Sequence, residues 1–502
     1  MMVYGCSTDT TVDVRLYTEL IPEEGGKVSP SFGIYKQGTR LKIKAIPEEG
    51  YQFVRWEGDL IGNENPVFIE LYGRRHVTAV FRFHTFASGD GSVANPYHVS
   101  TFDDLITITD VHNLDKHYIQ VNDIDASASE GYGDMGSMGG FPGIGSREHP
   151  FTGTYDGAGY QISNLHFKYN DKLLGFFRYI KDAEIKNLTI GKVQYEDPAE
   201  KEKMMDYSNL SDPATLDFNS IDVDTDNISV GGTLVAFNDG GRILNCHSVR
   251  QSFGSRFNNN GGLVGYNSGE IIYSSAETNV GFVSWTGGLV AINSGIIRNS
   301  FATGSARGMS SAGGLVGYNW GGTITDSFAE GDIHAYGGGG LVARNDGLIE
   351  RSAALGDSVL ASLGTGGGLV GVNSGEIRDS YTLTDVSRYE RIIGSGGLVG
   401  ENRSGTITRS FAAGKVSVYD NVDTEQGGFA GVNFGEITFS YWNTESSGFE
   451  RGVGEGDTDG STGLTTSQMT GPAARDHMPE FDWSDVWRTT SGYPMLQWQE
   501  EN

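Results

Sequence analysis

The sequence has few cysteines, few prolines and no long apolar run. Its 502 residues include 2 cysteines, Cys6 and Cys246, which cannot build a disulfide framework and lack the spacing of zinc ligands. No run of about 18 apolar residues occurs, so no segment is predicted to cross a membrane as a helix. Prolines number 12 and glycines 74, and because the glycines do not fall at every third position, they are expected to mark recurring turns rather than collagen.

Basic residues and catalytic signatures are also scarce. Lys and Arg total 36 against 64 Asp and Glu, which gives a formal net charge of −28. A chain this acidic repels phosphate backbones, so nucleic acid is not a predicted partner. His-Glu-x-x-His, Gly-x-Ser-x-Gly and phosphate-loop motifs are absent from the sequence.

A seven-residue motif of the type Gly-Gly-Leu-Val-Gly-Tyr-Asn recurs through the second half of the chain. Seven copies follow a variant that ends at Asn238, and their closing asparagines are Asn267, Asn293, Asn319, Asn345, Asn373, Asn402 and Asn433. Their spacings are 29, 26, 26, 26, 28, 29 and 31 residues. Such a period is typical of a solenoid, in which the asparagines would lie in one line and bond amide to amide.

A second column of small residues follows each asparagine by seven or eight positions. Its predicted members are Cys246, Ser275, Ser300, Ser327, Ser352, Ser380, Ser410 and Ser440. An isoleucine lies three positions before each member, Ile243 and Ile272 being the first two, and a mostly aromatic residue follows each member. Because Cys246 takes a serine position, we interpret it as a small buried side chain rather than a nucleophile.

The repeat predicts an all-β fold. Each unit holds two short apolar stretches around a glycine turn, too short for helices and rich in strand-forming residues. One unit cannot bury its apolar face alone, so units must stack. We therefore expect a parallel β-helix (β-solenoid) of about ten coils, roughly 50 Å long at one strand spacing per coil.

These motifs resemble the GLUG repeat family, which occurs in bacterial surface proteins and in non-catalytic parts of some secreted peptidases. The segment 12–83, with alternating strand patterns and Trp56, resembles the divergent InlB B-repeat, a small β-domain. Trp56 is expected in its core. Residues 1–11 are expected to form an N-terminal tail with a possible lipoprotein start.

The remaining boundaries follow from the repeat. Residues 84–150 are predicted to lead into the solenoid and cap it, with Thr101 as the N-cap of a short helix. The solenoid proper is expected over 151–440, with a polar insert at about 192–227. Residues 441–502, rich in tryptophan, are expected to form an aromatic C-terminal cap over exposed strand edges.

One acidic run could bind calcium. Asp222, Asp224 and Asp226 alternate as in the first half of a calcium loop, although the glycine after the third acid is missing and Thr233 stands where a bidentate Glu is needed. The alternative is a solvated acidic loop. Calcium is the one cofactor that the sequence suggests.

The variable segment of each coil is the candidate ligand-binding face. It carries Trp285, Tyr336, Arg388, Tyr389 and Tyr419, and aromatic side chains exposed along a solenoid suit recognition of a glycan or a surface protein. The alternative for each residue is local packing.

Two functions follow from these features. The first is a non-enzymatic extracellular or cell-surface scaffold or adhesin, with self-assembly into filaments or arrays as a further option. The alternative is a polysaccharide-active enzyme, a lyase or glycosidase, because sugar-cleaving enzymes also use parallel β-helices. The sequence around Cys6 resembles a lipoprotein processing site, which predicts an outer-membrane lipid anchor; the alternative is an incidental cysteine.

Overall fold

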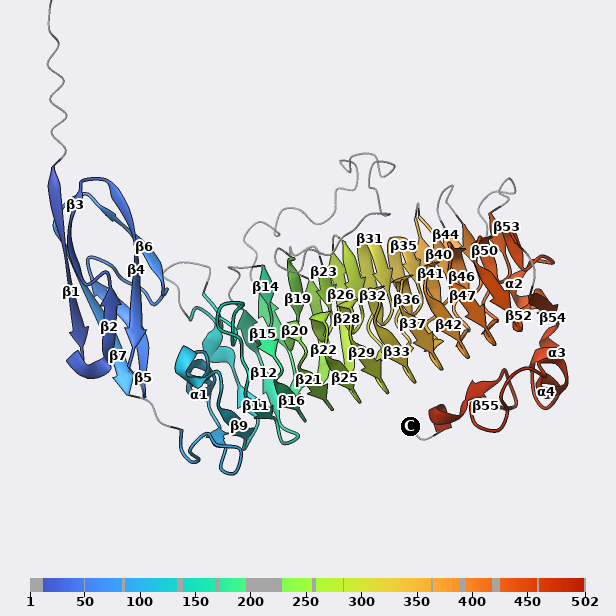
Figure 1. Ribbon diagram of the computed structural model, residues 1–502, viewed down its shortest axis with the longest axis horizontal. Coiled ribbons are helices and arrows are strands. Elements are labelled where there is room, and N and C mark those ends of the chain that lie inside the picture. Colours follow the sequence, from blue (N-terminus) through green and yellow to red (C-terminus); the bar gives the residue numbers. More distant parts are fainter. Residues whose placement is uncertain are drawn as a thin grey trace, which may run out of the picture.

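The chain forms a small β-domain followed by a long β-solenoid (Figure 1). This is a computed structural model. It describes residues 12–48, 50–83, 86–132, 139–167, 172–195, 228–254, 259–282, 284–362, 364–388, 394–417, 425–457 and 460–500.

Two small sheets build the N-terminal domain. One has the order β3 (Phe32–Lys36), β1 (Asp13–Ile21), β7 (Arg75–Phe83), β5 (Tyr51–Gly58), and the other the order β2 (Gly26–Ser29), β4 (Thr39–Pro47), β6 (Val67–Leu71). Trp56 is 1% exposed and its ring lies 5.0 Å from that of Phe53. The prediction that Trp56 fills the core of a β-domain is confirmed.

The solenoid has three long sides, each a parallel sheet. A 12-stranded sheet contains β8 (Tyr97–Val99), β9 (His117–Gln120), β11 (Thr154–Asp156), β16 (Glu184–Lys186), β21 (Arg242–Leu244), β25 (Glu270–Ile272), β29 (Ile296–Arg298), β33 (Thr323–Thr325), β37 (Leu348–Glu350), β42 (Glu376–Arg378), β47 (Thr406–Thr408) and β51 (Glu436–Thr438). A 10-stranded sheet contains β15 (Phe177–Lys181), β20 (Val235–Asp239), β24 (Val264–Asn267), β28 (Val290–Asn293), β32 (Val316–Asn319), β36 (Val342–Asn345), β41 (Val370–Asn373), β46 (Val399–Asn402), β50 (Ala430–Asn433) and β53 (Val453–Gly456). A 23-stranded sheet runs from β10 (Ile124–Asp125) to β54 (Ser461–Leu464). The predicted parallel solenoid is confirmed.

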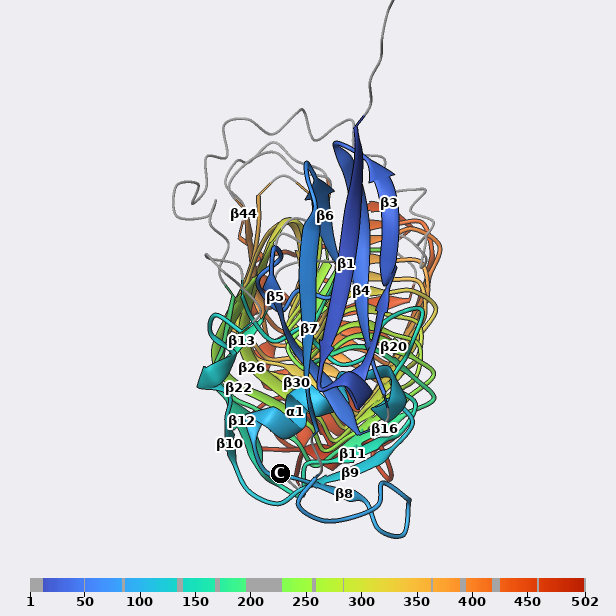
Figure 2. The same ribbon diagram turned by 90° about the vertical axis from the view of Figure 1, so that its left-hand side faces the viewer.

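The first coils lie in the segment that was expected to lead into the solenoid. There α1 (Phe102–Ile108) begins with the predicted cap, since Thr101 Oγ1 accepts a hydrogen bond from the Asp104 backbone N–H at 3.2 Å, and Asp104 reciprocates. Figure 2 shows α1 at this end of the stacked coils, beside the N-terminal domain. In the predicted insert, β18 (Val193–Tyr195) still pairs with β13 (Leu165–Phe167).

The asparagines form one ladder through the solenoid. Successive residues pair in register, and each amide Nδ2 donates to Oδ1 of the next asparagine at 2.7–2.9 Å. All eight are at most 1% exposed: Asn238, Asn267, Asn293, Asn319, Asn345, Asn373, Asn402 and Asn433. The predicted line and amide ladder are therefore confirmed.

The column of small residues required one correction. The Cys246 backbone N–H donates to Ser274 Oγ at 3.1 Å, and Ser274 N–H donates to Ser300 Oγ at 3.1 Å, so Ser274 rather than Ser275 belongs to the column. Likewise Ile271, not Ile272, pairs with Ile243. The residue just before each column member has a left-handed φ of 44–52°. In this coil that residue is Tyr273, so the column member is Ser274. The sequence alone did not distinguish Ser274 from the adjacent Ser275.

The predicted aromatic cap is present and reaches further than predicted. After β52 (Ser440–Asn443), the chain forms α2 (Thr444–Ser447), α3 (Thr466–Met469) and α4 (Ala473–His477) and then turns back along the side of the solenoid (Figure 1). Its short hairpin, β55 (Trp487–Arg488) with β56 (Met495–Leu496), packs on rings of earlier coils. Trp498 Nε1 donates to Arg351 O at 2.9 Å, so the cap covers a flank as well as an end.

Candidate functional site

The predicted ligand-binding face is only partly within the described residues. Trp285, on β27 (Trp285–Gly287), is 4% exposed, and its ring lies 5.0 Å from that of Tyr318 in a neighbouring coil. The expectation of an exposed Trp285 is wrong, because stacking on the next coil buries the indole. Tyr336, on β35 (Ile333–Gly339), is half-buried.

The other predicted site residues lie outside what the structure describes. They are the side chain of Arg388, at the end of β44 (Asp385–Arg388), together with Tyr389, Tyr419, Asp222, Asp224, Asp226 and Cys6. Within the described ranges, no group of three or more His, Cys, Asp or Glu side chains is placed to hold a metal ion.

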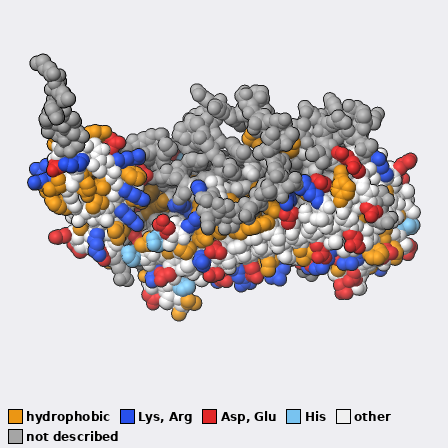
Figure 3. Space-filling model, turned by 45° about the horizontal axis from the view of Figure 1, so that its top comes forward, with side chains coloured by type: hydrophobic (Ala, Val, Ile, Leu, Met, Phe, Trp, Pro, Cys, Tyr) orange, Lys and Arg blue, Asp and Glu red, His pale blue; other side chains and the backbone are white. Residues whose placement is uncertain are grey.

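Charged residues on the solenoid flank are paired from coil to coil. Arg351 donates to both carboxylate oxygens of Asp326 at 2.7 and 3.0 Å, and Arg409 does the same to Asp379 at 2.8 and 2.7 Å. These four residues occupy the left-handed corner column. Figure 3 shows acidic and basic side chains interspersed along the visible flank. The carboxylates of this corner therefore support neighbouring coils.

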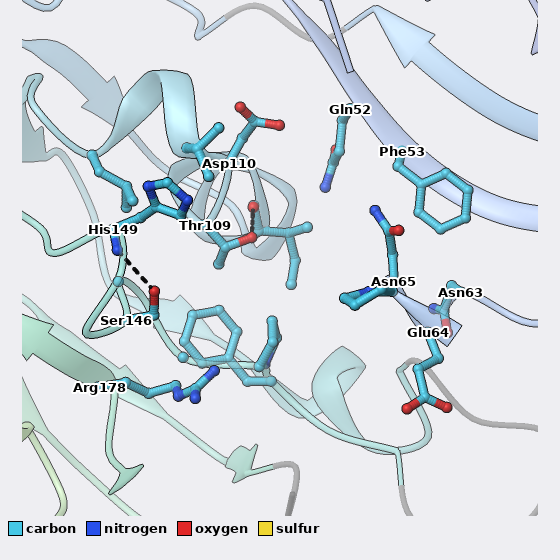
Figure 4. Close-up of a pocket in the computed structure, with 18 of the residues that line it drawn as sticks. Gln52, Phe53, Asn63, Glu64, Asn65, Thr109, Asp110, Ser146, His149 and Arg178 are labelled. Atoms are coloured by element: carbon cyan, nitrogen blue, oxygen red, sulfur yellow. Dashed lines mark hydrogen bonds between the residues drawn. The ribbon is translucent and has the colours of Figure 1, made fainter. Parts of the chain in front are cut away.

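A hollow lies elsewhere, between the N-terminal domain and the first coils (Figure 4). It has a volume of about 490 Å³. The domain contributes Gln52, Phe53 and the loop 63–66, and the solenoid contributes the end of α1, the loop 140–149 and Arg178. An ion pair ties the two sides together, with Arg82 Nη2 3.1 Å from Asp103 Oδ2.

Gln52 is the most unusual residue of this cleft. It lies on β5, where a register shift between Phe53 and Arg55 interrupts the pairing with β7. Its side chain points into the cleft (Figure 4). Although Gln52 is only 8% exposed, its Oε1 has no hydrogen-bond partner in the described ranges of the chain.

A second amide shares this condition while a third does not. Asn63 Oδ1 is buried and also lacks a partner in the described chain. Asn65, by contrast, is fixed to the backbone of Ala45, whose N–H donates to Oδ1 at 2.8 Å and whose carbonyl accepts from Nδ2 at 2.6 Å. Asn65 therefore shapes the loop, while Gln52 and Asn63 keep free acceptors.

The solenoid side supplies hydroxyl and charged groups. Asp110 accepts from the His112 backbone N–H at 3.0 Å and lies 2.8 Å from His112 Nδ1. The backbone N–H of His149 donates to Ser146 Oγ at 3.1 Å (Figure 4). Arg178 and Glu148 also line the cleft, so both signs of charge face the space.

Sequence reasoning missed this cleft. Its residues come from two modules that follow different patterns, and none of them recurs in the repeat. The available signal was a glutamine in a strand rich in aromatic residues, since Gln52 is buried between half-buried Tyr51 and buried Phe53.

Cys246, in contrast, matches its interpretation. It is buried, and its free thiol lies among the interior residues of the solenoid. Burial raises the pKa of Cys246 to about 12. A thiol of this kind stays protonated and is unsuited to nucleophilic attack at neutral pH.

Comparison with known families supports the two-module organisation. The family described as "Divergent InlB B-repeat domain" matches residues 16–84, and "The GLUG motif" matches residues 309–333. The N-terminal domain thus matches a divergent InlB B-repeat, and one unit of the solenoid matches the GLUG motif. The matched GLUG unit contains β31 (Ala306–Gly313) in part and β32, and the coils on either side of it repeat its register.

Two further comparisons cover longer parts of the chain, at lower similarity. Halomucin of Haloquadratum walsbyi (strain DSM 16790 / HBSQ001) is 29% identical over 200 residues, covering 32% of this chain and 2% of halomucin. The chain thus spans about 2% of that relative's length. A crystal structure of a putative immunoglobulin A1 protease from Bacteroides ovatus aligns at 15% identity and a TM-score of 0.35, covering 82% of this chain and 95% of that one.

The family assignment clarifies the cleft. Gln52 and Asn63 lie within the range that matches the InlB-type domain, and Asp110, Ser146 and Arg178 lie in the first coils of the solenoid, outside the matched GLUG range. The cleft is therefore a product of joining the two modules. In the described part of the chain, no helix is long and apolar enough to cross a membrane.

Proposed function

We propose that this protein is a non-enzymatic scaffold of the bacterial cell surface or extracellular space, which holds binding surfaces on a stiff rod. The observation that carries the proposal is the unbroken asparagine ladder from Asn238 to Asn433, because it locks every coil to the next through buried side chains. Buried and fully satisfied polar networks of this kind rigidify a fold. A rod built from identical rungs suits display rather than chemistry.

The acidic residues support a non-catalytic role. A glycosidase needs one carboxyl group held neutral beside a second carboxylate. Hydrogen bonds to their carboxylates lower the pKa of Glu48, Asp90, Asp125, Glu445 and Asp482, which keeps these groups ionised. The flank carboxylates Asp326 and Asp379 are held by bidentate arginines.

A glycan-release assay tests this proposal. The purified chain is incubated with a panel of bacterial and host polysaccharides, and new reducing ends and unsaturated products are measured. We expect none above the level of a heat-unfolded sample. Turnover that disappears on Asp110→Asn, with unchanged unfolding behaviour, would establish the polysaccharide-active alternative instead.

The variable segments remain our proposed adhesive face. Arg388 and Tyr389 pair a charge with an aromatic ring in the segment that departs most from the repeat. We expect Arg388→Ala with Tyr389→Ala to weaken binding to glycan or cell surfaces without changing the unfolding midpoint. Binding that persists in the double variant would move the adhesive function elsewhere.

Attachment through Cys6 is proposed on the lipoprotein-like sequence around it. Intact mass measurement of protein from native membranes would then show Cys6 as the first residue with acyl chains. An unmodified residue before Cys6 would contradict the anchor.

A further inference from the structure

The cleft between the two modules contains buried hydrogen-bond acceptors for which its described residues provide no donor. Gln52 is more than nine-tenths buried, its side chain points into the cleft, and its Oε1 has no hydrogen-bond partner among the residues that the structure describes. A buried polar atom left unpaired is destabilising, and such atoms are uncommon in native proteins. The second unpaired acceptor, Asn63 Oδ1, lines the same space. Two such atoms in one cavity indicate a missing hydrogen-bond donor.

The cavity has the size and the mixture of surfaces of a small-ligand site. Its volume of about 490 Å³ lies within the range of about 300–1,000 Å³ that is usual for such sites. On the solenoid side, buried apolar residues such as Leu114 and Phe141 back the cleft, and Val111 presents exposed apolar surface to it. Polar and charged side chains line the rest of the cleft, and polar groups placed beside apolar surface can fix a ligand's orientation.

The donors and acceptors define the ligand's chemistry. A primary amide offers one acceptor and two donors, and hydroxyl groups can satisfy both at once. Thr109 adds a hydroxyl whose proton is already committed to Ile106 O at 2.7 Å, so its oxygen can only accept. Charges of both signs line the cleft, from Glu64, Asp110 and Glu148 and from Lys44 and Arg178, so a ligand meets a mixed rather than a single-sign surface.

We propose that this cleft is a binding site for a short, neutral oligosaccharide. Ligand hydroxyl groups donate to Gln52 Oε1 and Asn63 Oδ1, and the C–H faces of the sugar rings pack on the apolar surface. Binding needs both modules, because the amides come from the InlB-type domain and this apolar surface from the solenoid. The inference is independent of the proposed adhesive face along the flank.

The test is calorimetric titration of the full chain with cellobiose, lactose and N,N′-diacetylchitobiose. We expect at least one to bind with a Kd tighter than about 1 mM. Gln52→Leu removes the buried amide at similar volume and should weaken that binding about tenfold or more, because a site built to bind hydroxyl groups loses a partner. Asn63→Leu should weaken it in the same direction.

Matched controls separate a site from general damage. Gln194→Leu makes the same change at an exposed glutamine on β18, and we expect unchanged affinity. Unfolding midpoints of all variants are measured in parallel, so that loss of binding in a folded Gln52→Leu protein supports the site. Unchanged affinity in both Gln52→Leu and Asn63→Leu overturns the proposal. No saccharide binding, with binding of the neutral peptide Gly-Ser-Gly-Ser, overturns the ligand class.

Discussion

Buried amides are treated in opposite ways in two regions of this molecule. Inside the solenoid, each asparagine between the two ends of the ladder donates to the copy one coil away and accepts from the copy on the other side. At the module junction, the amide oxygens of Gln52 and Asn63 are buried without a partner among the described residues. In a stack of similar coils, each buried amide finds a complementary amide on the next coil. The module junction occurs once in the chain, so a buried amide there has no copy to bond with, and its hydrogen-bond partner must come from another molecule.

The largest loss of stability is expected from a substitution in the middle of the asparagine ladder. Asn345→Leu leaves one N–H of Asn319 Nδ2 without its acceptor, while the other still donates to Gly322 O, and it leaves Asn373 Oδ1 without its donor; both residues are buried. At about 1–3 kcal/mol for each of these two unsatisfied groups, we expect the free energy of unfolding to fall by about 2–6 kcal/mol. Urea unfolding followed by circular dichroism measures the change.

A matched control makes the same substitution at an exposed asparagine that does not belong to the ladder. Asn279 is exposed, and its Oδ1 accepts one bond, from Ser305 N–H at 3.0 Å. Asn279→Leu should change the free energy of unfolding by less than about 1 kcal/mol. Equal losses at both positions would show that ladder burial adds nothing to stability.

A smaller effect is expected from pH at Cys246. Burial raises the pKa of its thiol to about 12, whereas an unfolded cysteine has a pKa of about 8.5. Between these values the unfolded chain loses a proton that the folded chain keeps, so stability is complete below about pH 8.5 and falls as pH rises. By pH 10 the contribution lost is about 2 kcal/mol.

The measurement compares urea midpoints at pH 8 and pH 10 for the wild type and for Cys246→Ser. The serine variant restores the residue found elsewhere in the column and removes the titrating thiol. It should lose less stability over this interval, which lies at or below the ordinary pKa of tyrosine. Identical declines in the two proteins would mean that another group dominates.

The smallest expected change in stability comes from Gln52→Leu. The free protein loses an unpaired acceptor and gains apolar contact, so its unfolding midpoint should stay constant or rise slightly. This outcome is opposite in sign to that of Asn345→Leu, although both variants replace a buried amide with leucine. A clear loss of stability on Gln52→Leu would show that its side chain already has a partner.

The solenoid could be predicted because the sequence motif that specifies each coil is repeated. Eight copies of the asparagine revealed the ladder, and the period fixed the stacking of coils. The position of Ser274 was missed by one residue, since Ser274 and Ser275 are identical and only the left-handed corner at Tyr273 distinguishes them. The burial of Trp285 depends on Tyr318 in another coil, a contact that a single unit does not encode.

The cleft could not be predicted for a different reason. Its lining residues come from two modules that contact each other only in the folded protein. The sequence pattern of one module contains no information about where the other will pack. The Arg82–Asp103 ion pair that joins them consists of two ordinary charges in a chain of 100 charged side chains, the sum of 36 basic and 64 acidic residues.

The returning C-terminal segment changes how the rod would carry mechanical load. Trp498 bonds to the carbonyl of Arg351, 147 residues earlier in the chain, and Tyr381 OH contacts Gln499 at 3.0 Å. A pull on this end is therefore expected to load the contacts at Arg351 and Tyr381, in the middle of the array, as well as the last coils. While these contacts hold, the returning segment shares the force with the last turns of the solenoid.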